Sequence, residues 1–224
     1  MDALDPNRTT ALRARRAWAA CAGVGLLAVI GARFADAWVY AHLTLPDVYE
    51  HDWGRLLRLA GYLPVWIVVA AGMACARVRF RGWRAVAFAP EGRVLLATTL
   101  GGALAEPLKL LIRSDRPRAG LGLHHFHPWT ADLWSTSGLG MPSSHTLVAF
   151  SAAAMLTRCF PRGGVLWFAL ATGCGVTRVV SGAHFLSDVV AAAVLGPLVA
   201  ALVWRWLEQW SPAVLDEAGG DGQS

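Results

Sequence analysis

The sequence predicts an all-α, polytopic membrane protein built as a bundle of six transmembrane helices. Of its 224 residues, 55% are hydrophobic and only 16% are charged, and the mean hydropathy is positive. A water-soluble domain of this size does not bury so much apolar surface. Six apolar runs are also long enough to cross about 30 Å of hydrocarbon. The 11 tryptophans, many near the ends of these runs, suit the membrane interface.

The six runs are expected to be helices, because the bilayer core offers no water to unpaired backbone groups and no alternating pattern of a β-barrel is present. The first run follows a basic N-terminus at residues 1–16 and continues past the length of a signal peptide, so we interpret it as a retained helix. The Gly, Asp and Ser content of residues 208–224 predicts a disordered cytoplasmic tail. Between these ends, the domain at 17–207 contains the expected spans 17–40, 56–76, 94–112, 143–160, 165–183 and 186–207.

Arginine placement predicts the orientation of the chain. If it crosses six times, three arginine-bearing segments lie on one side, which the positive-inside rule makes cytoplasmic. Both termini are then cytoplasmic, and the 43–54 loop, the 114–141 loop and the 182–185 turn face the periplasm or exterior. We therefore expect a multi-pass protein of the inner (plasma) membrane. The arginines are Arg8, Arg13, Arg15, Arg16, Arg77, Arg79, Arg81, Arg84, Arg158 and Arg162.

The net charge of +5 does not indicate nucleic-acid binding, because the arginines are scattered between apolar runs and form no patch with interleaved aromatic residues. The four cysteines also lie in or beside apolar runs without metal-ligand spacing. Neither a disulfide framework nor a zinc site is expected, and the cysteines are interpreted as packing residues. They are Cys21, Cys75, Cys159 and Cys174.

Lys109 is the only lysine of the chain and lies near the outer end of the third expected span. An ammonium at membrane depth costs about 2.5 to 3.5 kcal/mol, so its presence calls for a reason. Arg116 follows seven residues later and precedes Pro117, which is expected to end the helix. If they share one helix face, Lys109 and Arg116 would bind an anion from two sides. The alternative is a pair of snorkelling side chains, with Glu106 neutralising Lys109.

A second polar segment, Pro142-Ser143-Ser144-His145, stands just before the fourth expected span. Pro and Ser favour a helix start, and the free amides of a helix N-terminus bind phosphate. His145 would lie one turn inside such an anion site. The alternative is plain helix capping.

The third segment contains Arg178, His184 and Asp188. A carboxylate four residues after a histidine holds one imidazole nitrogen and leaves the other free to act as a nucleophile. The alternative is a structural hydrogen bond. By the arginine pattern all three segments face the same outer side. Together they predict a site for a tetrahedral oxyanion with a nucleophile and a proton donor.

These segments resemble the three signature motifs of the type 2 phosphatidic acid phosphatase superfamily in order and in internal spacing. The resemblance covers residues 109–188 and extends to the six-span layout of the family's membrane branch, which has the acid phosphatase/vanadium haloperoxidase-like fold. Two positions depart from the family pattern: Ser144 replaces the usual Gly and Thr177 the usual Ser. Neither removes a catalytic group, although the side chain of Ser144 is placed to crowd the oxyanion.

The resemblance implies a covalent phosphohistidine mechanism without metal or other cofactor. His184 is the implied nucleophile, oriented by Asp188, and His145 the implied proton donor and activator of water. The substrate class is a lipid phosphate: an isoprenyl pyrophosphate, phosphatidylglycerol phosphate, phosphatidic acid or a lipid A phosphate. The expected partners are this lipid and the membrane, and the oligomeric state is not predicted. The implied phosphate ligands are Lys109, Arg116, Arg178, Ser143 and Ser144.

Each of five polar residues in or beside the long outer loop has two possible interpretations. His124, His125 and His127 lack a nearby carboxylate or cysteine in the sequence, which favours a polar interfacial loop over a metal cluster. Arg113 and Arg118 are interpreted as interfacial anchors, with contact to a second phosphate as the alternative.

Two other functions fit the same motifs. A phosphotransferase would pass the phosphoryl group to a lipid or sugar hydroxyl instead of water. A catalytically silent membrane scaffold would keep only the fold, but such a protein is expected to lose at least one of His145, His184 and Asp188. The haloperoxidase relatives are soluble, so six spans argue against that branch.

Overall fold

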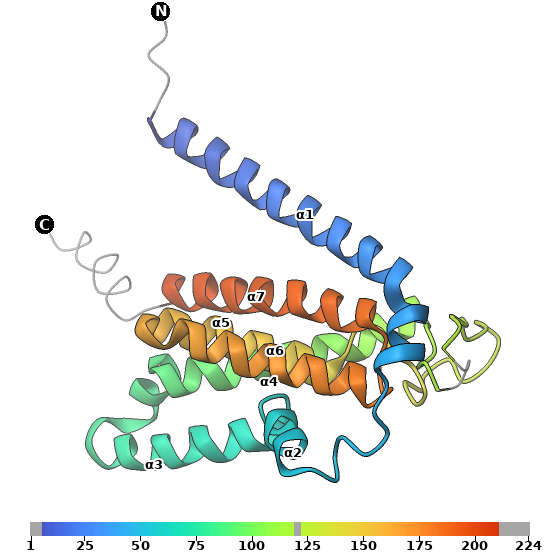
Figure 1. Cartoon of the computed structure of the whole chain (residues 1–224). Helices are drawn as coiled ribbons and strands as arrows, with labels where there is room; N and C mark the ends of the chain where they lie inside the picture. The colour runs from blue at the N-terminus through green and yellow to red at the C-terminus, as the bar shows by residue number, and fades with distance from the viewer. Residues whose placement is uncertain (1–5, 119–121, 211–224) are drawn as a thin grey trace, which may run out of the picture.

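The apolar runs of the sequence form α-helices in the computed structural model (Figure 1), since a helix pairs the backbone groups of a run within the run itself. The structure describes residues 6–118 and 122–210, without the side chains of residues 6–15 and 76–87. Within these ranges there is no strand, only two isolated bridges, so the all-α prediction is confirmed there. The helices are α1 (Pro6–Leu43), α2 (Asp52–Leu59), α3 (Leu63–Phe88), α4 (Pro90–Ile112), α5 (Ser144–Cys159), α6 (Gly164–Val180) and α7 (Leu186–Gln209), with a 3₁₀ turn at Pro161–Gly163.

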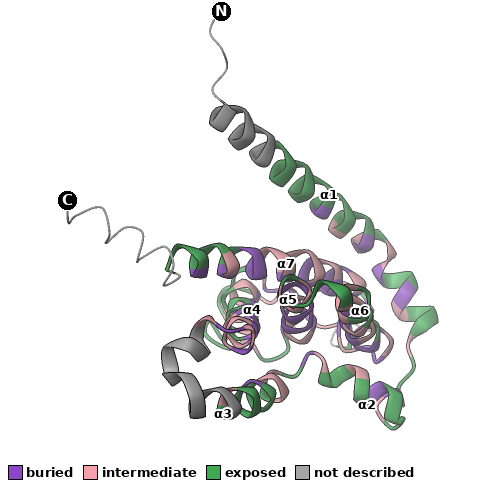
Figure 2. Cartoon of the chain, turned by 90° about the vertical axis from the view of Figure 1, so that its left-hand side faces the viewer, coloured by how far each residue is buried: buried purple, intermediate pink, exposed green. Residues whose placement is uncertain are grey.

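Helix α5 forms the centre of the bundle and packs against α4, α6 and α7. Figure 2 shows it as the most continuously buried helix. Its buried side chains are mostly small, among them Ala149, Ala152 and Ala153, and small residues let helix backbones approach closely. With 16 residues, α5 is about 24 Å long and is shorter than a full hydrocarbon crossing.

Helix α1 is attached to the rest of the bundle mainly through α7. Its N-terminal part diverges from the bundle and, where side chains are described from Arg16 on, is largely exposed, whereas its last turns lie against α7 and the loop after α4 (Figures 1 and 2). The contacts of this end of α1 therefore fix how it meets the other helices.

The prediction of one continuous span at 56–76 is wrong. Helices α2 and α3 flank a break at residues 60–62 and are bent by 64° relative to each other. A Cβ atom on Gly61 would clash with the carbonyl oxygen of His145 and lie 2.7 Å from Cys174 Sγ. The chain thus bends where Gly61 meets α5 and α6, and Pro64 favours a new helix start just after the break.

The structure has the character of a multi-pass membrane protein, but a count of exactly six spans is not established. Four described helices are long and apolar enough to cross a membrane, and the bent pair α2 and α3 is a fifth candidate. Helix α5 falls short in length. The four are Arg16–Leu43, Pro90–Ile112, Pro161–Val180 and Leu186–Gln209.

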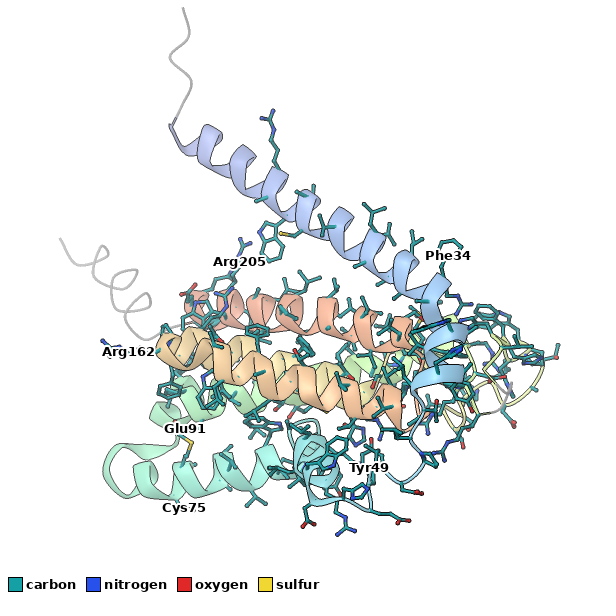
Figure 3. All side chains as sticks on the ribbon, viewed as in Figure 1. Phe34, Tyr49, Cys75, Glu91, Arg162 and Arg205 are labelled. Carbon is teal, nitrogen blue, oxygen red and sulfur yellow. The ribbon has the colours of Figure 1, made fainter. Side chains whose placement is uncertain are left out.

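The two ends of the bundle differ in what they carry. Figure 3 places Arg162 and Arg205 at one end and Tyr49 at the other, where the long loop after α4 also lies. The start of α1 is at the arginine end, as the sequence predicts. The side chains of the 77–84 arginines and most of the expected tail lie outside the described residues, and α7 continues to Gln209. The sidedness in a membrane stays a prediction.

Candidate active site

Four segments from distant parts of the sequence meet at the end of the bundle opposite Arg162. They are the last turn of α4 with the loop that follows it, the start of α5, the end of α6, and the turn that leads into α7. The predicted site residues all lie on these segments. The structure therefore brings together the three motifs that the sequence separates by up to 79 residues.

Lys109 and Arg116 do not share a helix face, contrary to the prediction. Helix α4 ends at Ile112, because Arg113 adopts a left-handed conformation with φ 55° and caps the helix. Beyond it the chain turns back over the bundle end. The backbone amide of Arg116 donates to the Gly138 carbonyl at 2.9 Å, and its Nε donates to the Leu139 carbonyl at 3.3 Å. Backbone pairing within the long loop, and not helical periodicity, therefore positions Arg116.

Lys109 is buried and held by two side chains. Its Nζ donates to Glu106 Oε1 at 2.8 Å and to Ser144 Oγ at 2.5 Å. The Ser144 hydroxyl in turn donates to Glu106 Oε1 at 3.1 Å. The serine that replaces the usual glycine thus joins the lysine and the glutamate. The predicted partnership between Lys109 and Glu106 is present.

The second motif forms the N-terminus of α5, as predicted. Ser143 is the N-cap residue, in an extended conformation, and Ser144 is the first residue of the helix. The backbone amide of Ser143 donates to the Asp188 carbonyl oxygen at 3.2 Å, and its hydroxyl accepts from Thr146 Oγ1 at 3.0 Å. The first bond ties the start of α5 to the start of α7, and the second lies within the first turn of α5.

His184 lies directly before α7 and is paired with Asp188 in its first turn. The distance between His184 Nδ1 and Asp188 Oδ2 is 3.3 Å, and the same oxygen accepts from the Phe185 amide at 3.1 Å. Both side chains are buried. Burial, and then the positive charges of Arg178 and Arg116, lower the pKa of His184 well below its ordinary value. A neutral imidazole with Nδ1 engaged leaves Nε2 to act on a substrate.

Arg178 at the end of α6 is fixed by Tyr49, a residue that the sequence reasoning missed. The guanidinium Nη1 donates to the Tyr49 hydroxyl at 2.9 Å, and that hydroxyl donates to the Thr177 carbonyl at 3.2 Å. Tyr49 belongs to the loop between α1 and α2, far from the three motifs. No spacing in the sequence connects it to Arg178, although a tyrosine in an expected outer loop was the available signal.

Two buried nitrogens at the site have no hydrogen-bond partner among the described residues, namely His145 Nε2 and Arg178 Nε. Buried polar groups are nearly always paired, so a polar ligand or a water molecule is expected to complete the hydrogen bonds of these two atoms. Lys109, Arg178 and His184 all lie close enough to His145 to act on it electrostatically. The arrangement suits an anion held between these groups.

The two arginines that flank the first motif contact the protein backbone. Arg113 is buried and donates to the carbonyl oxygens of His127, Pro128 and Ala131 at 2.6 to 3.1 Å. Arg118 Nη2 donates to the Ser181 carbonyl at 2.7 Å. These contacts favour a role in holding the long loop over contact with a second phosphate.

The three loop histidines separate into two groups. His125 Nδ1 lies 2.8 Å and His127 Nδ1 3.6 Å from Asp115, a carboxylate that the sequence reasoning did not place beside them. His124 faces α1 instead, where Nε2 lies 3.0 Å from Asp36 Oδ2. Among the described residues, no group of three or more His, Cys, Asp or Glu side chains is arranged to hold a metal ion.

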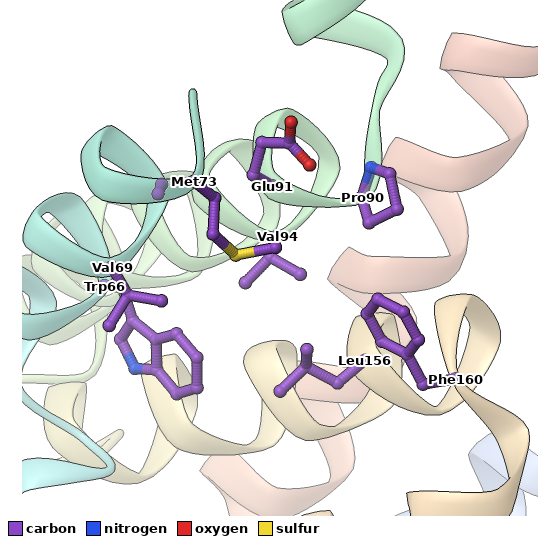
Figure 4. Close-up of a pocket in the computed structure, with 9 residues that line it drawn as sticks. Trp66, Val69, Met73, Pro90, Glu91, Val94, Leu156 and Phe160 are labelled. Atoms are coloured by element: carbon purple, nitrogen blue, oxygen red, sulfur yellow. The ribbon is translucent and has the colours of Figure 1, made fainter. Parts of the chain in front are cut away.

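A small cavity far from these residues lies between α3, α4 and α5 at the arginine end of the bundle (Figure 4). Its volume is about 30 Å³, which accommodates one or two water molecules. Trp66, Met73, Val94 and Phe160 surround it, with Glu91 at its edge. It contains none of the predicted site residues and is unrelated to the anion site.

Comparison with known proteins identifies both a family and a fold. The model of the PAP2 superfamily matches residues 91–212, which is more than half of the chain. Among solved structures, the chain is similar to the crystal structure of a transmembrane PAP2 type phosphatidylglycerolphosphate phosphatase from Bacillus subtilis. The TM-score is 0.59 at 20% sequence identity, over 87% of this chain and 97% of that one. At this identity the likeness shows the fold.

Curated relatives match over shorter stretches. The chain is 40% identical over 63 residues to the bacitracin transport permease protein BcrC of Bacillus licheniformis, covering 28% of this chain and 31% of that protein. It is 34% identical over 108 residues to a lipid A 1-phosphatase of Rhizobium etli, covering 47% of this chain and 45% of that protein. The matches therefore span less than half of the relatives' own lengths.

Proposed function

Because the chain belongs to the PAP2 superfamily, we propose that it is a membrane-bound lipid phosphatase that acts through a phosphohistidine on His184. The observation that carries the proposal is the convergence of Lys109, Arg116 and Arg178 on the buried pair of His184 and Asp188. Three cations around a neutral imidazole suit attack on a phosphoryl group, whose negative charge they balance.

In the first step, His184 Nε2 attacks phosphorus in line with the bond to the lipid oxygen. The phosphorus–nitrogen bond forms as the phosphorus–oxygen bond breaks, and His145 donates a proton to the departing lipid oxygen. Asp188 accepts the hydrogen bond of Nδ1–H and stabilises the positive charge that the ring gains. Lys109, Arg116 and Arg178, with the amides at the start of α5, bind the phosphoryl oxygens.

In the second step, His145, now deprotonated, takes a proton from a water molecule. The resulting oxygen nucleophile attacks phosphorus, the phosphorus–nitrogen bond breaks, and inorganic phosphate leaves while His184 returns to its starting form. If a lipid or sugar hydroxyl takes the place of water, the same intermediate yields a phosphotransferase. No metal ion takes part in this scheme, because the three cations balance the charge.

A lipid substrate is supported by two apolar grooves whose linings include residues close in the chain to those of the anion site. One, of about 380 Å³, lies between α1, α6 and α7, and its lining includes Val179 and Leu186, close in the chain to Arg178 and His184. The other, of about 370 Å³, is lined by Pro107 and Leu110, on either side of Lys109, and by tryptophans of the long loop. A hydrocarbon chain fits such surfaces, whereas a soluble phosphate ester gains nothing from them.

We also propose the predicted topology: six crossings, cytoplasmic termini, and an active site that faces the periplasm or exterior of an inner (plasma) membrane. In this arrangement α5 completes the sixth crossing inside the bundle, shielded from lipid by its neighbours. The catalytic domain corresponds to residues 17–207.

The test is phosphate release by purified protein in EDTA from a panel of lipids. The panel contains lipid A 1-phosphate, phosphatidylglycerolphosphate, phosphatidic acid and an isoprenyl pyrophosphate. The His184→Ala variant is the loss-of-nucleophile control, and His125→Ala, which changes an exposed loop histidine, is the matched control.

We expect release from at least one lipid by the wild type and by His125→Ala, and none by His184→Ala. Release that does not depend on His184 would refute the phosphohistidine mechanism. If excess lipid alcohol is present and a phosphorylated alcohol forms instead of free phosphate, the protein is a phosphotransferase and not a hydrolase. The absence of any reaction on the whole panel would favour the silent scaffold.

A further inference from the structure

Helix α1 carries a buried carboxylate at a position outside the segment that the PAP2 model matches. Asp36 is 1% exposed and lies within the candidate span Arg16–Leu43. An ionisable side chain in a membrane helix is costly, and in membrane proteins such residues face the protein interior and mark function. Asp36 meets the first part of this description, because it points to the bundle at the end where α1 contacts α7.

Asp36 binds the first turn of α7 through both of its oxygens. Oδ1 accepts from the backbone amide of Ser187 at 2.8 Å, and Oδ2 accepts from the Ser187 hydroxyl at 2.5 Å. The first amides of a helix have no partner within the helix, and a carboxylate near them is stabilising. The N-cap residue of α7 is Phe185, whose side chain offers no acceptor. Asp188 accepts from the Phe185 amide within α7, and Asp36, from another helix, caps the Ser187 amide.

His124 and Arg33 extend the contact. Arg33 donates to His124 Nδ1, so the ring proton resides on Nε2. This atom lies 3.0 Å from Asp36 Oδ2, but the angle between them is not that of a hydrogen bond. Burial and the charge of Arg33 lower the pKa of His124, which favours this neutral form. The His124 ring also packs on Phe185, with the ring centroids 4.0 Å apart. The loop histidine thus covers the residue between His184 and the α7 helix.

The fixed residue, Ser187, is the immediate neighbour of Asp188, which orients the nucleophile. We propose that Asp36 is a positioning residue that holds the first turn of α7, and with it the pair of Asp188 and His184, in the reactive geometry. This inference rests on the proposed function. It assigns to α1, which otherwise diverges from the bundle, an indirect part in catalysis that acts through α7.

A purely structural role, in which Asp36 only attaches α1 to the bundle, makes a different prediction. Losing it would lower the unfolding temperature and the fraction of active protein, while each active molecule kept its turnover number. A positioning role lowers kcat per active site and leaves KM nearly unchanged, because the phosphate ligands themselves are intact.

The experiment compares wild type, Asp36→Asn, Ser187→Ala and the double variant on the best lipid of the panel. Asp47→Asn is the matched control, because Asp47 is an exposed acid just beyond α1. Active sites are counted by the burst of phosphoenzyme, and folding is followed by the unfolding temperature. Ser187→Ala removes only one hydroxyl, which keeps the test interpretable if Asp36→Asn folds poorly.

We expect kcat per active site to fall about 10- to 100-fold in Asp36→Asn, since small displacements at a reacting centre have effects of this size. The fall in Ser187→Ala is in the same direction and smaller, and the double variant is no worse than Asp36→Asn alone, because the two groups form one contact. Wild-type kcat in both single variants would overturn the positioning role while leaving the phosphatase intact. A wild type without His184-dependent turnover would overturn both proposals.

Discussion

Gly140 lies so close to the catalytic pair that one added methyl group is expected to disturb it. A Cβ atom at this position would be 2.7 Å from Asp188 Oδ2, where ordinary contact begins at 3.4 Å. Either the carboxylate or the loop must therefore move by about 0.7 Å. The same oxygen pairs with His184 Nδ1 at 3.3 Å, and Asp188 is fully buried, so the carboxylate has no free space in which to move without losing that contact.

We expect Gly140→Ala to lower kcat about 100-fold, the scale of a displacement approaching 1 Å at a reacting group. KM should change less than kcat, because Lys109 and Arg178 are untouched and only Arg116, which bonds to Gly138 and Leu139, lies beside the altered residue. The fold should survive, since the atom that the methyl group meets is the end of a side chain and not backbone. The assay is steady-state phosphate release with the unfolding temperature measured in parallel.

Gly72→Ala provides the control for this experiment. Gly72 lies in α3, and nothing lies within 4 Å of a Cβ atom added there. Alanine also favours a helix over glycine, so this variant should match the wild type in turnover and equal or exceed it in stability. Two results would refute the reasoning that the close approach of Gly140 to Asp188 keeps the carboxylate beside His184. One is a wild-type kcat in Gly140→Ala, and the other is a loss of activity that comes only from a higher KM.

Three further predictions concern the groups around the phosphate. Because burial and Arg178 lower the pKa of His184, the nucleophile stays neutral as the pH falls. The acid limb of the pH profile of kcat/KM should therefore lie below pH 6.5, and a limb at or above pH 6.5 would contradict this prediction. Ser144→Gly removes an acceptor 2.5 Å from Lys109 Nζ and should lower kcat/KM about tenfold, whereas a rise would mean that the hydroxyl crowds the oxyanion. Tyr49→Phe frees Arg178 and should raise KM about tenfold with kcat kept, as titration with substrate would reveal.

The fold class could be predicted from composition and run length alone, because the bilayer leaves few ways to satisfy a buried backbone. The helix boundaries could not. The sequence from 56 to 76 is uniformly apolar enough to suggest one span, yet Gly61 must approach α5 and α6, and the chain breaks there. Helix α5 packs against α4, α6 and α7 and ends at Cys159, two residues before Pro161, which cannot continue a helix.

Within the candidate site, the pairing of His184 with Asp188 was predictable because spacing along the chain controls it. A histidine and an aspartate four residues apart at a helix start face each other whatever surrounds them, as His184 and Asp188 do. The same argument failed for Lys109 and Arg116. The left-handed cap at Arg113 ends the helix between them, and the long loop places the arginine by its own backbone pairing.

The sequence by itself determined the order and the spacing of the chemical groups in the candidate site and the apolar runs beside them, because these are properties of the chain and of the apolar solvent. Only the tertiary structure decided which residues of distant segments hold these groups in place through hydrogen bonds. Tyr49 bonds to Arg178, and Asp36 bonds to the first turn of α7. Such contacts join residues more than 100 positions apart. They follow from how whole helices pack, and no local pattern in a single chain encodes them.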